Sequence, residues 1–309
     1  MENERVDLII IGGSAASVSA GIYAVRRNLN FKIISKDFGG EVATSGEVDN
    51  YPGIPDTDGL ALAEKFKKHL ADYGVEPEIG IEVEKITKQE DGTFLISAKE
   101  GKEYVAKAVI VGTGVHPREL NVSREKELRH KGVSYCTVCD GPLFPKKTVA
   151  IIGGGNSALE AGIMMADIAS HVYVINKNSF FKGDQILIDN LSKKKNVEII
   201  YNAMTTEIVG DGFVSGLKYK DSGGAERELK VDGIFIHIGM LPNSGIVPEN
   251  VEKTKAGEIV VSKNCETNIP GLFAAGDVTD IPFKQIVVAA GQGTAALLQA
   301  VNYLNRLKQ

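Results

Sequence analysis

The chain has 309 residues with a hydrophobic fraction of 43% and a charged fraction of 24%, values typical of globular domains with buried cores. Its formal net charge of −5 argues against a nucleic-acid-binding surface, and no apolar run approaches the length that spans a membrane. Three cysteines are too few for a disulfide scaffold. We therefore expect a cytoplasmic protein that contacts neither nucleic acid nor membrane.

The first half of the chain predicts a βαβ unit followed by a β-hairpin. A strand buried on both faces of a parallel sheet has an almost continuous apolar sequence, and a run of this kind, interrupted by Asp7, leads into Gly12-Gly13. The expected elements are a strand over 6–11, a helix over 15–27, a strand over 31–34, a hairpin of 81–89 with 94–98 around Asp91-Gly92, and a strand over 109–111.

The second half repeats the order of the first. The expected elements are a strand over 148–152 that ends in Gly153-Gly154-Gly155, a helix over 156–168, strands over 171–175, 197–201, 216–219 and 234–237, a strand over 271–275, and a helix over 288–304. The segment after Asn243 is too short for a domain of its own, so we expect it to complete the first domain. The pattern predicts an α/β protein of two Rossmann-like nucleotide-binding domains, each a parallel sheet with a small antiparallel β layer. Their expected ranges are 1–117 with 245–309, and 118–244.

Two glycine turns predict phosphate binding. Gly153-x-Gly155-x-x-Ala158 fits the Rossmann fingerprint, in which a tight turn lets backbone N–H groups and a helix dipole hold a pyrophosphate. The first turn, Gly12 to Ser17, has serine at the second and third glycine positions, which weakens the signal without excluding the site. Asp277 follows a strand end, where it suits either a flavin ribityl hydroxyl or a simple helix cap.

A Cys-x-x-Cys pair, Cys136 and Cys139, lies between the two glycine turns. Such a pair closes a small disulfide at little entropic cost, or supplies half of a zinc site. Zinc takes about four ligands. Only Cys265 and His130 remain as candidates, so we expect redox chemistry and no metal, with Cys265 a packed structural thiol.

These motifs together resemble the low-molecular-weight thioredoxin reductases and the related flavoprotein subunit of alkyl hydroperoxide reductase without its N-terminal extension. The resemblance covers nearly the whole chain. It rests on Phe38-Gly39-Gly40-Glu41, Asp49-Asn50-Tyr51-Pro52-Gly53, Gly112-Thr113-Gly114, Cys136 to Pro142, Gly153 to Ala158, Gly239 to Asn243, Phe273 to Asp277 and Lys284-Gln285-Ile286.

The resemblance implies a homodimer in which FAD is held by the terminal segments, while the middle domain carries the NAD(P) site and the cysteine pair. It also implies that Cys139 faces the flavin, Cys136 attacks the partner disulfide and Asp140 moves the proton. The FAD residues it implies are Gly12, Gly13, Ser14, Ala15, Ala16, Lys36, Gly39, Gly40, Glu41, Val42, Asn50, Thr113, Gly114, Gly276, Asp277, Lys284, Gln285 and Ile286. Its nucleotide residues are Gly153, Gly155, Asn156, Ser157, Ala158, Asn176, Lys177, Lys182 and Gly239.

The segment after the second strand of the middle domain departs from the family pattern. It has neither the arginine pair that grips a ribose phosphate nor the acid that accepts from a ribose hydroxyl. In place of the acid, Asn176 can bond a ribose hydroxyl. In place of the arginines, Lys177 or Lys182 can make a single contact with a phosphate. Three interpretations stay open: NADH or NADPH as the donor, a ferredoxin or deazaflavin as the donor, or a lost donor site.

The sequence therefore predicts an FAD-dependent thioredoxin-disulfide reductase that carries electrons from NAD(P)H through FAD and Cys136–Cys139 to a thioredoxin-like protein. One alternative is a reductase of a peroxiredoxin system that feeds a glutaredoxin-like carrier. Another is a nucleotide-sensing binding module whose cysteine pair is a regulatory disulfide.

Overall fold

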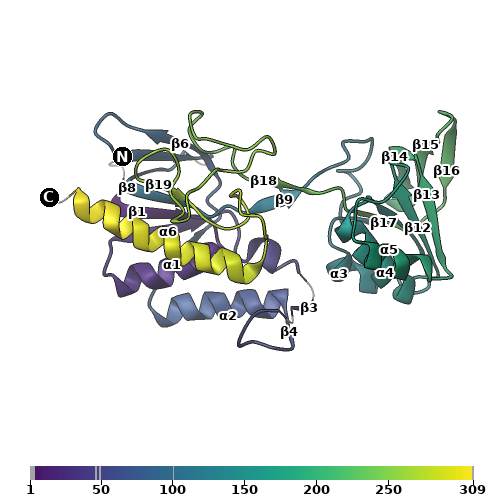
Figure 1. Cartoon of the computed structure of the whole chain (residues 1–309), viewed down its shortest axis with the longest axis horizontal. Coiled ribbons are helices and arrows are strands. Elements are labelled where there is room, and N and C mark those ends of the chain that lie inside the picture. The colour runs from purple at the N-terminus through teal and green to yellow at the C-terminus, as the bar shows by residue number, and fades with distance from the viewer. Residues whose placement is uncertain (1–3, 46, 49, 100, 308–309) are drawn as a thin grey trace. The chain divides into compact units, whose positions relative to one another are not determined.

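The structure is a computed structural model that describes residues 4–45, 47–48, 50–99 and 101–307. The chain divides into two compact units, shown in Figure 1. Unit 1 comprises residues 1–116 with 241–309, and unit 2 comprises residues 117–240. The divisions lie one and four residues from the predicted boundaries at 117 and 244. The α/β fold with parallel sheets and smaller antiparallel sheets is confirmed.

A seven-stranded mixed sheet forms the centre of unit 1. Its parallel part follows the order β5-β2-β1-β8-β19. Strand β8 also pairs with the antiparallel strand β7, which in turn pairs with β6. The antiparallel strands thus continue the parallel sheet instead of forming a separate layer. The strands are β1 (Glu4–Ile11), β2 (Phe31–Ser35), β5 (Glu78–Ile79), β6 (Val83–Lys88), β7 (Phe94–Ala98), β8 (Glu103–Val111) and β19 (Leu272–Ala274).

The described residues of unit 1 form three α-helices: α1 (Ala15–Arg26), α2 (Gly59–Asp72) and α6 (Ile286–Arg306). The long C-terminal helix α6 packs along α1, as Figure 1 shows. The two helices approach closely at Gly293, where an added Cβ would lie 1.9 Å from the carbonyl oxygen of Ala16. Through this contact and the pairing of β19 with β8, the C-terminal segment packs on the first part of the chain.

The close contact between α1 and α6 predicts opposite effects at two glycines of one helix. Gly293→Ala should lower the unfolding free energy of the chain by about 1–3 kcal/mol, because its methyl group overlaps backbone of α1. Gly291→Ala is the matched control, since a Cβ there meets nothing within 4 Å and alanine favours a helix by up to about 1 kcal/mol. Urea unfolding of both variants measures the difference, and equal effects would contradict the packing.

Unit 2 has a five-stranded parallel sheet in the order β10-β17-β11-β12-β13 and a three-stranded antiparallel sheet in the order β14-β15-β16. The strands are β10 (Val133–Ser134), β11 (Thr148–Ile152), β12 (His171–Asn176), β13 (Val197–Tyr201), β14 (Met204–Asp211), β15 (Phe213–Lys220), β16 (Glu226–Leu229) and β17 (Gly233–Ile236). The helices are α3 (Thr137–Asp140), α4 (Asn156–Ile168) and α5 (Gln185–Ser192).

The apolar run of β11 is buried on both sides of its sheet. Val149 and Ile151 pack into a core with α4, while Ala150 and Ile152 pack into a second core with residues of the antiparallel sheet. Alternate residues of a strand point to opposite faces. Both faces are therefore covered over residues 149–152, which explains why the apolar run is continuous after Thr148.

The remaining short elements are the 3-10 turns η1 (Gly40–Val42) and η2 (Gly141–Leu143) and the strands β3 (Glu47–Val48), β4 (Thr57–Asp58), β9 (Val115–Pro117) and β18 (Met240–Pro242). Strands β9 and β18 pair with each other where the chain passes between the two units. Within the described residues, no helix is both long and apolar enough to cross a membrane.

Candidate functional site

The predicted FAD residues of unit 1 gather at the carboxyl edge of its sheet. Strands β1, β8 and β19 are parallel, so their carboxyl ends meet at one edge, and ligands of such sheets bind where the strand order reverses. The order reverses between β1 and β8. Gly12 and Gly112 follow these two strands, and an added Cβ on Gly12, whose φ is +126°, would lie 2.2 Å from the Gly112 carbonyl oxygen.

The N-terminus of α1 fits an anionic group of a cofactor. No side chain caps this helix among the described residues, and its first turn has no acid, so backbone N–H groups remain for a pyrophosphate. The hydroxyl of Ser14 donates to the Gly39 carbonyl oxygen at 2.6 Å, which joins the first turn to the turn after β2. The buried hydroxyl of Ser17 has no partner among the described residues. Serine at the two irregular positions is thus compatible with the predicted phosphate site, since neither side chain caps the helix.

Burial raises the pKa of two carboxyl groups near this edge, Asp277 and Glu41. Partial burial raises the pKa of Asp277 above its usual value, and the nearby Lys284 opposes that change. Burial also raises the pKa of Glu41, with a smaller contribution from Asp277 in the same direction. A carboxylate that is poorly hydrated in the free protein gains from a hydroxyl donor, which is what the ribityl chain of a flavin offers. These residues fit FAD.

Other predicted FAD residues have partners within unit 1. The Lys284 ammonium contacts a Glu258 carboxylate oxygen at 2.9 Å, and Lys36 lies 3.3 Å from Glu82. The Asn50 amide donates to Gln285 at 3.2 Å, which brings these two predicted residues together. Both lysine side chains are therefore engaged by carboxylates of the protein. Asp49 lies outside the described residues.

The rest of the predicted FAD set lies in short turns after strands and at the start of α6. Val42 is buried in η1, Thr113 and Gly114 follow β8, and Ile286 begins α6. The Thr113 hydroxyl donates to the Asn243 carbonyl oxygen at 2.8 Å, and the Asn243 N–H donates to the Gly114 carbonyl oxygen at 2.9 Å.

Unit 2 repeats this arrangement at its own sheet edge. The strand order reverses between β11 and β17, and an added Cβ on Gly153 would lie 2.1 Å from the carbonyl oxygen of His237 and 2.8 Å from the Ala158 Cβ. No side chain caps α4 among the described residues, and a Cβ on Gly155 would meet nothing within 4 Å. The tight turn, the open second glycine and the bare helix end fit a pyrophosphate.

Residues near the nucleotide loop are held by hydrogen bonds of the protein. The Asn176 side chain is 1% exposed; its Nδ2 donates to the Phe180 carbonyl oxygen at 2.9 Å, and its Oδ1 accepts from the Asn178 N–H at 3.0 Å. This placement argues against the ribose contact expected for Asn176. The Lys182 N–H donates to the Gly154 carbonyl oxygen at 2.7 Å, so that lysine lies beside the loop.

Two more predicted nucleotide residues are exposed. The side chains of Lys177 and Lys182 both face solvent, where either can meet a phosphate. Gly239, with φ of +105°, follows β17 and accepts from the Arg118 N–H at 2.9 Å. At the start of α4, Ser157 is exposed, and the Asn156 amide donates to an Asp184 carboxylate oxygen at 2.9 Å.

The cysteine pair follows β10 at the same edge of unit 2. Cys136 takes part in a disulfide, while Cys265 is free. The side chain of Cys139 lies outside the described part of the chain. Asp140 ends α3, where its N–H donates to the Cys136 carbonyl oxygen at 3.1 Å, and its side chain is half-buried. No cluster of three or more metal-binding side chains occurs among the described residues.

Three side chains that sequence reasoning missed fix the backbone around Cys136. The Ser134 hydroxyl accepts from the Cys136 N–H at 3.0 Å. The Tyr135 hydroxyl donates at 2.6 Å to Glu125, a carboxylate that is 1% exposed and also accepts backbone N–H groups. Burial and this carboxylate raise the pKa of Tyr135 well above its usual range, so the phenol remains a donor.

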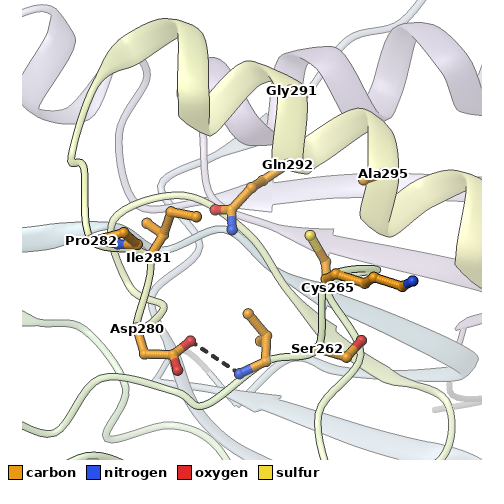
Figure 2. Close-up of a pocket in the computed structure, with 10 residues that line it drawn as sticks. Ser262, Cys265, Asp280, Ile281, Pro282, Gly291, Gln292 and Ala295 are labelled. Atoms are coloured by element: carbon orange, nitrogen blue, oxygen red, sulfur yellow. Dashed lines mark hydrogen bonds between the residues drawn. The ribbon is translucent and has the colours of Figure 1, made fainter.

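Cys265 lines a pocket of about 370 Å³ in unit 1, shown in Figure 2. Its thiol is 2% exposed, and burial raises its pKa to about 11. A thiol in this state is a poor nucleophile. The pocket also contains Gln292, whose side chain accepts from the Gly276 N–H at 2.8 Å. None of the predicted FAD residues lines this pocket, and the thiol is a packing group.

A family model for pyridine nucleotide-disulphide oxidoreductases matches residues 6–293. The chain belongs to this family, whose members use a flavin and a pyridine nucleotide to carry out redox chemistry on a disulfide. The resemblance found in the sequence is confirmed.

Three relatives place the chain within that family. It is 41% identical to the F subunit of Escherichia coli alkyl hydroperoxide reductase over 99% of this chain, but it spans about 60% of that relative's length. The crystal structure of T. acidophilum thioredoxin reductase is 38% identical with a TM-score of 0.82, covering 99% of this chain and 100% of that one. Lactococcus lactis thioredoxin reductase is 30% identical with a TM-score of 0.85, over 97% and 99%.

Proposed function

We propose that the chain is an FAD-dependent reductase that passes electrons from NAD(P)H to the disulfide of a thioredoxin-like protein through Cys136 and Cys139. The observation that carries the proposal is the disulfide of Cys136, which follows β10 at the same sheet edge as the Gly153 loop. A bound flavin supplies the relay between a two-electron donor and a disulfide. Unit 1 is the proposed FAD domain and unit 2 the proposed nucleotide domain.

The surroundings of Cys136 support a protein as the electron acceptor. Val138 is 42% exposed and Leu143 is 72% exposed, although both are apolar and both lie within seven residues of Cys136. Exposed apolar side chains beside a reactive group are typical of a surface that docks another protein. We propose that Cys136 attacks the partner disulfide, that Cys139 exchanges electrons with the flavin, and that Asp140 supplies the proton to the leaving sulfur.

NADH or NADPH is the proposed donor, because the Gly153 loop and the bare N-terminus of α4 keep the features that bind a pyrophosphate. The exposed ammonium groups of Lys177 and Lys182 are the groups left to contact a ribose phosphate, since the Asn176 amide is bonded within its own loop. A homodimer in the cytoplasm is part of the same proposal.

An anaerobic titration tests the donor. Purified protein should contain flavin, and stoichiometric NADH or NADPH should bleach its visible absorbance. If only a reduced ferredoxin or deazaflavin bleaches the flavin, the proposed donor is wrong, while the proposed disulfide reductase activity is unaffected. A colourless protein that does not take up FAD would exclude every flavoenzyme interpretation and favour a nucleotide-sensing module.

A second candidate function is supported by the 41% identity to the F subunit of alkyl hydroperoxide reductase. In this case the acceptor is a separate glutaredoxin-like carrier of a peroxiredoxin system. Turnover with a thioredoxin and with such a carrier, at equal concentrations of disulfide, distinguishes the two functions. A kcat/KM that is at least about tenfold higher for one acceptor would identify the physiological class.

A further inference from the structure

His237 occupies a position that the two units build in the same way. In unit 1 the Gly112 N–H donates to the carbonyl oxygen of Ile11, and in unit 2 the His237 N–H donates to the carbonyl oxygen of Ile152, both at 2.7 Å. Each residue also receives the close approach of the first glycine of its nucleotide turn. Unit 1 has no side chain at this position, whereas unit 2 has an imidazole.

The imidazole of His237 reaches the turn of the cysteine pair. Its Nε2 lies 2.6 Å from the hydroxyl oxygen of Thr137, which is 3% exposed and stands between Cys136 and Cys139 in the chain. Burial lowers the pKa of His237 to about 4, so the ring is neutral near pH 7. A neutral ring and a hydroxyl form one hydrogen bond in either tautomer.

Thr137 is a third anchor beside Cys136, after Ser134 and Tyr135. Ser134 and Tyr135 are held on one side by the Cys136 backbone and by buried Glu125, and Thr137 is held on the other side by His237. A disulfide requires a narrow range of Cα separations and dihedral angles. A turn with both flanks fixed holds its thiols at a higher effective concentration, which favours the disulfide over the dithiol.

We propose that His237 is a positioning residue for the redox disulfide: through its hydrogen bond to Thr137, it holds the turn of Cys136 in the geometry that the disulfide requires. The inference rests on the proposed function in that it treats this disulfide as the one that turns over. The loop of Gly153 and the cysteine turn thereby share one residue, since the His237 backbone supports the first and its ring supports the second.

The test is the equilibrium between the full-length protein and dithiothreitol, measured by alkylation of thiols after an acid quench. Dithiothreitol gives two electrons and two protons to the protein disulfide, which becomes two thiols, while dithiothreitol becomes a cyclic disulfide. In Thr137→Val and in His237→Leu, the equilibrium constant for reduction should rise about tenfold, which corresponds to about 30 mV for a two-electron couple. The double variant should show the same change, because each single variant removes the same bond.

Conservative variants separate positioning from folding. Thr137→Ser and His237→Gln keep a hydrogen-bonding partner and should restore most of the native equilibrium. Thr205→Val is the matched control, since this buried hydroxyl of β14 has no partner among the described residues and its removal should leave the equilibrium unchanged. An equilibrium within about twofold of native in Thr137→Val and His237→Leu would overturn the proposal. The measurement uses neither electron donor nor partner protein, so its outcome is independent of the proposed turnover.

Discussion

Replacing Cys136 with serine is expected to abolish reduction of a protein disulfide while reduction of the flavin by its donor continues. Only a thiolate attacks a disulfide at a useful rate, and serine forms no mixed disulfide. Turnover with a thioredoxin-like acceptor should therefore fall by at least about a thousandfold. Stopped-flow absorbance of the flavin and a coupled assay of acceptor thiols measure the two half-reactions separately.

Cys265→Ala is the control for Cys136→Ser. The Cys265 thiol is buried and its pKa is raised, so we expect its removal to leave turnover close to native. Disulfide turnover that survives in Cys136→Ser would contradict the proposed order of the two cysteines. Turnover lost together with flavin reduction would instead show that the variant damages the donor half-reaction.

Most of the fold follows from local sequence signals. The apolar runs before Gly12 and Gly153, of which the first is interrupted by Asp7, predict buried parallel strands. The structure covers both faces of β1 and β11. Helix α2 was not predicted, although Leu62, Phe66 and Leu70 recur at helical spacing and Asp58 caps the first turn. That signal was present in the sequence. No local signal in the sequence shows that β8 pairs with both parallel and antiparallel strands, because this depends on pairings between distant segments.

The glycine turns were predictable because the turn itself requires glycine. Gly12 and Gly153 have positive φ, and a Cβ added to either residue would lie within 2.2 Å of a neighbouring carbonyl oxygen. Any other residue would therefore disrupt the turn. The anchors of Cys136 are different. His237 is 100 residues away from Thr137 in the chain, and only the parallel pairing of β10, β17 and β11 brings them together. No spacing rule predicts such a contact.

The orientation of Asn176 shows the same limit. It is the last residue of β12, where a ribose-binding residue stands in a dinucleotide fold, and this position is the basis of the predicted ribose contact. The structure turns the amide into its own loop, onto Phe180 and Asn178. A residue type and a position thus predict which contacts are chemically allowed, while the local backbone decides which of them form.

His237 should make the native chain lose stability in mild acid. Its pKa is about 4 when folded, against about 6.5 when unfolded, and burial is the cause. Between these values the unfolded chain binds a proton that the folded chain does not, so falling pH favours unfolding. The contribution of a neutral, buried ring is fully present above pH 6.5 and is lost as the pH falls toward 4. From pH 7 to pH 5 this loss amounts to roughly 2 kcal/mol.

The measurement is urea unfolding of the native chain and of His237→Gln at both pH values. Glutamine does not titrate, so the variant should lose roughly 2 kcal/mol less than the native chain over this interval. His130→Gln removes an exposed histidine of the same unit and controls for the loss of an imidazole as such. An identical pH dependence in native and His237→Gln would contradict this prediction, because it would mean that the ring has the same pKa in the folded and the unfolded chain and becomes charged in the folded chain between pH 7 and pH 5. Both nitrogens of a charged ring are donors, so the ring would then donate to the Thr137 hydroxyl oxygen. The strength of this hydrogen bond would change with pH.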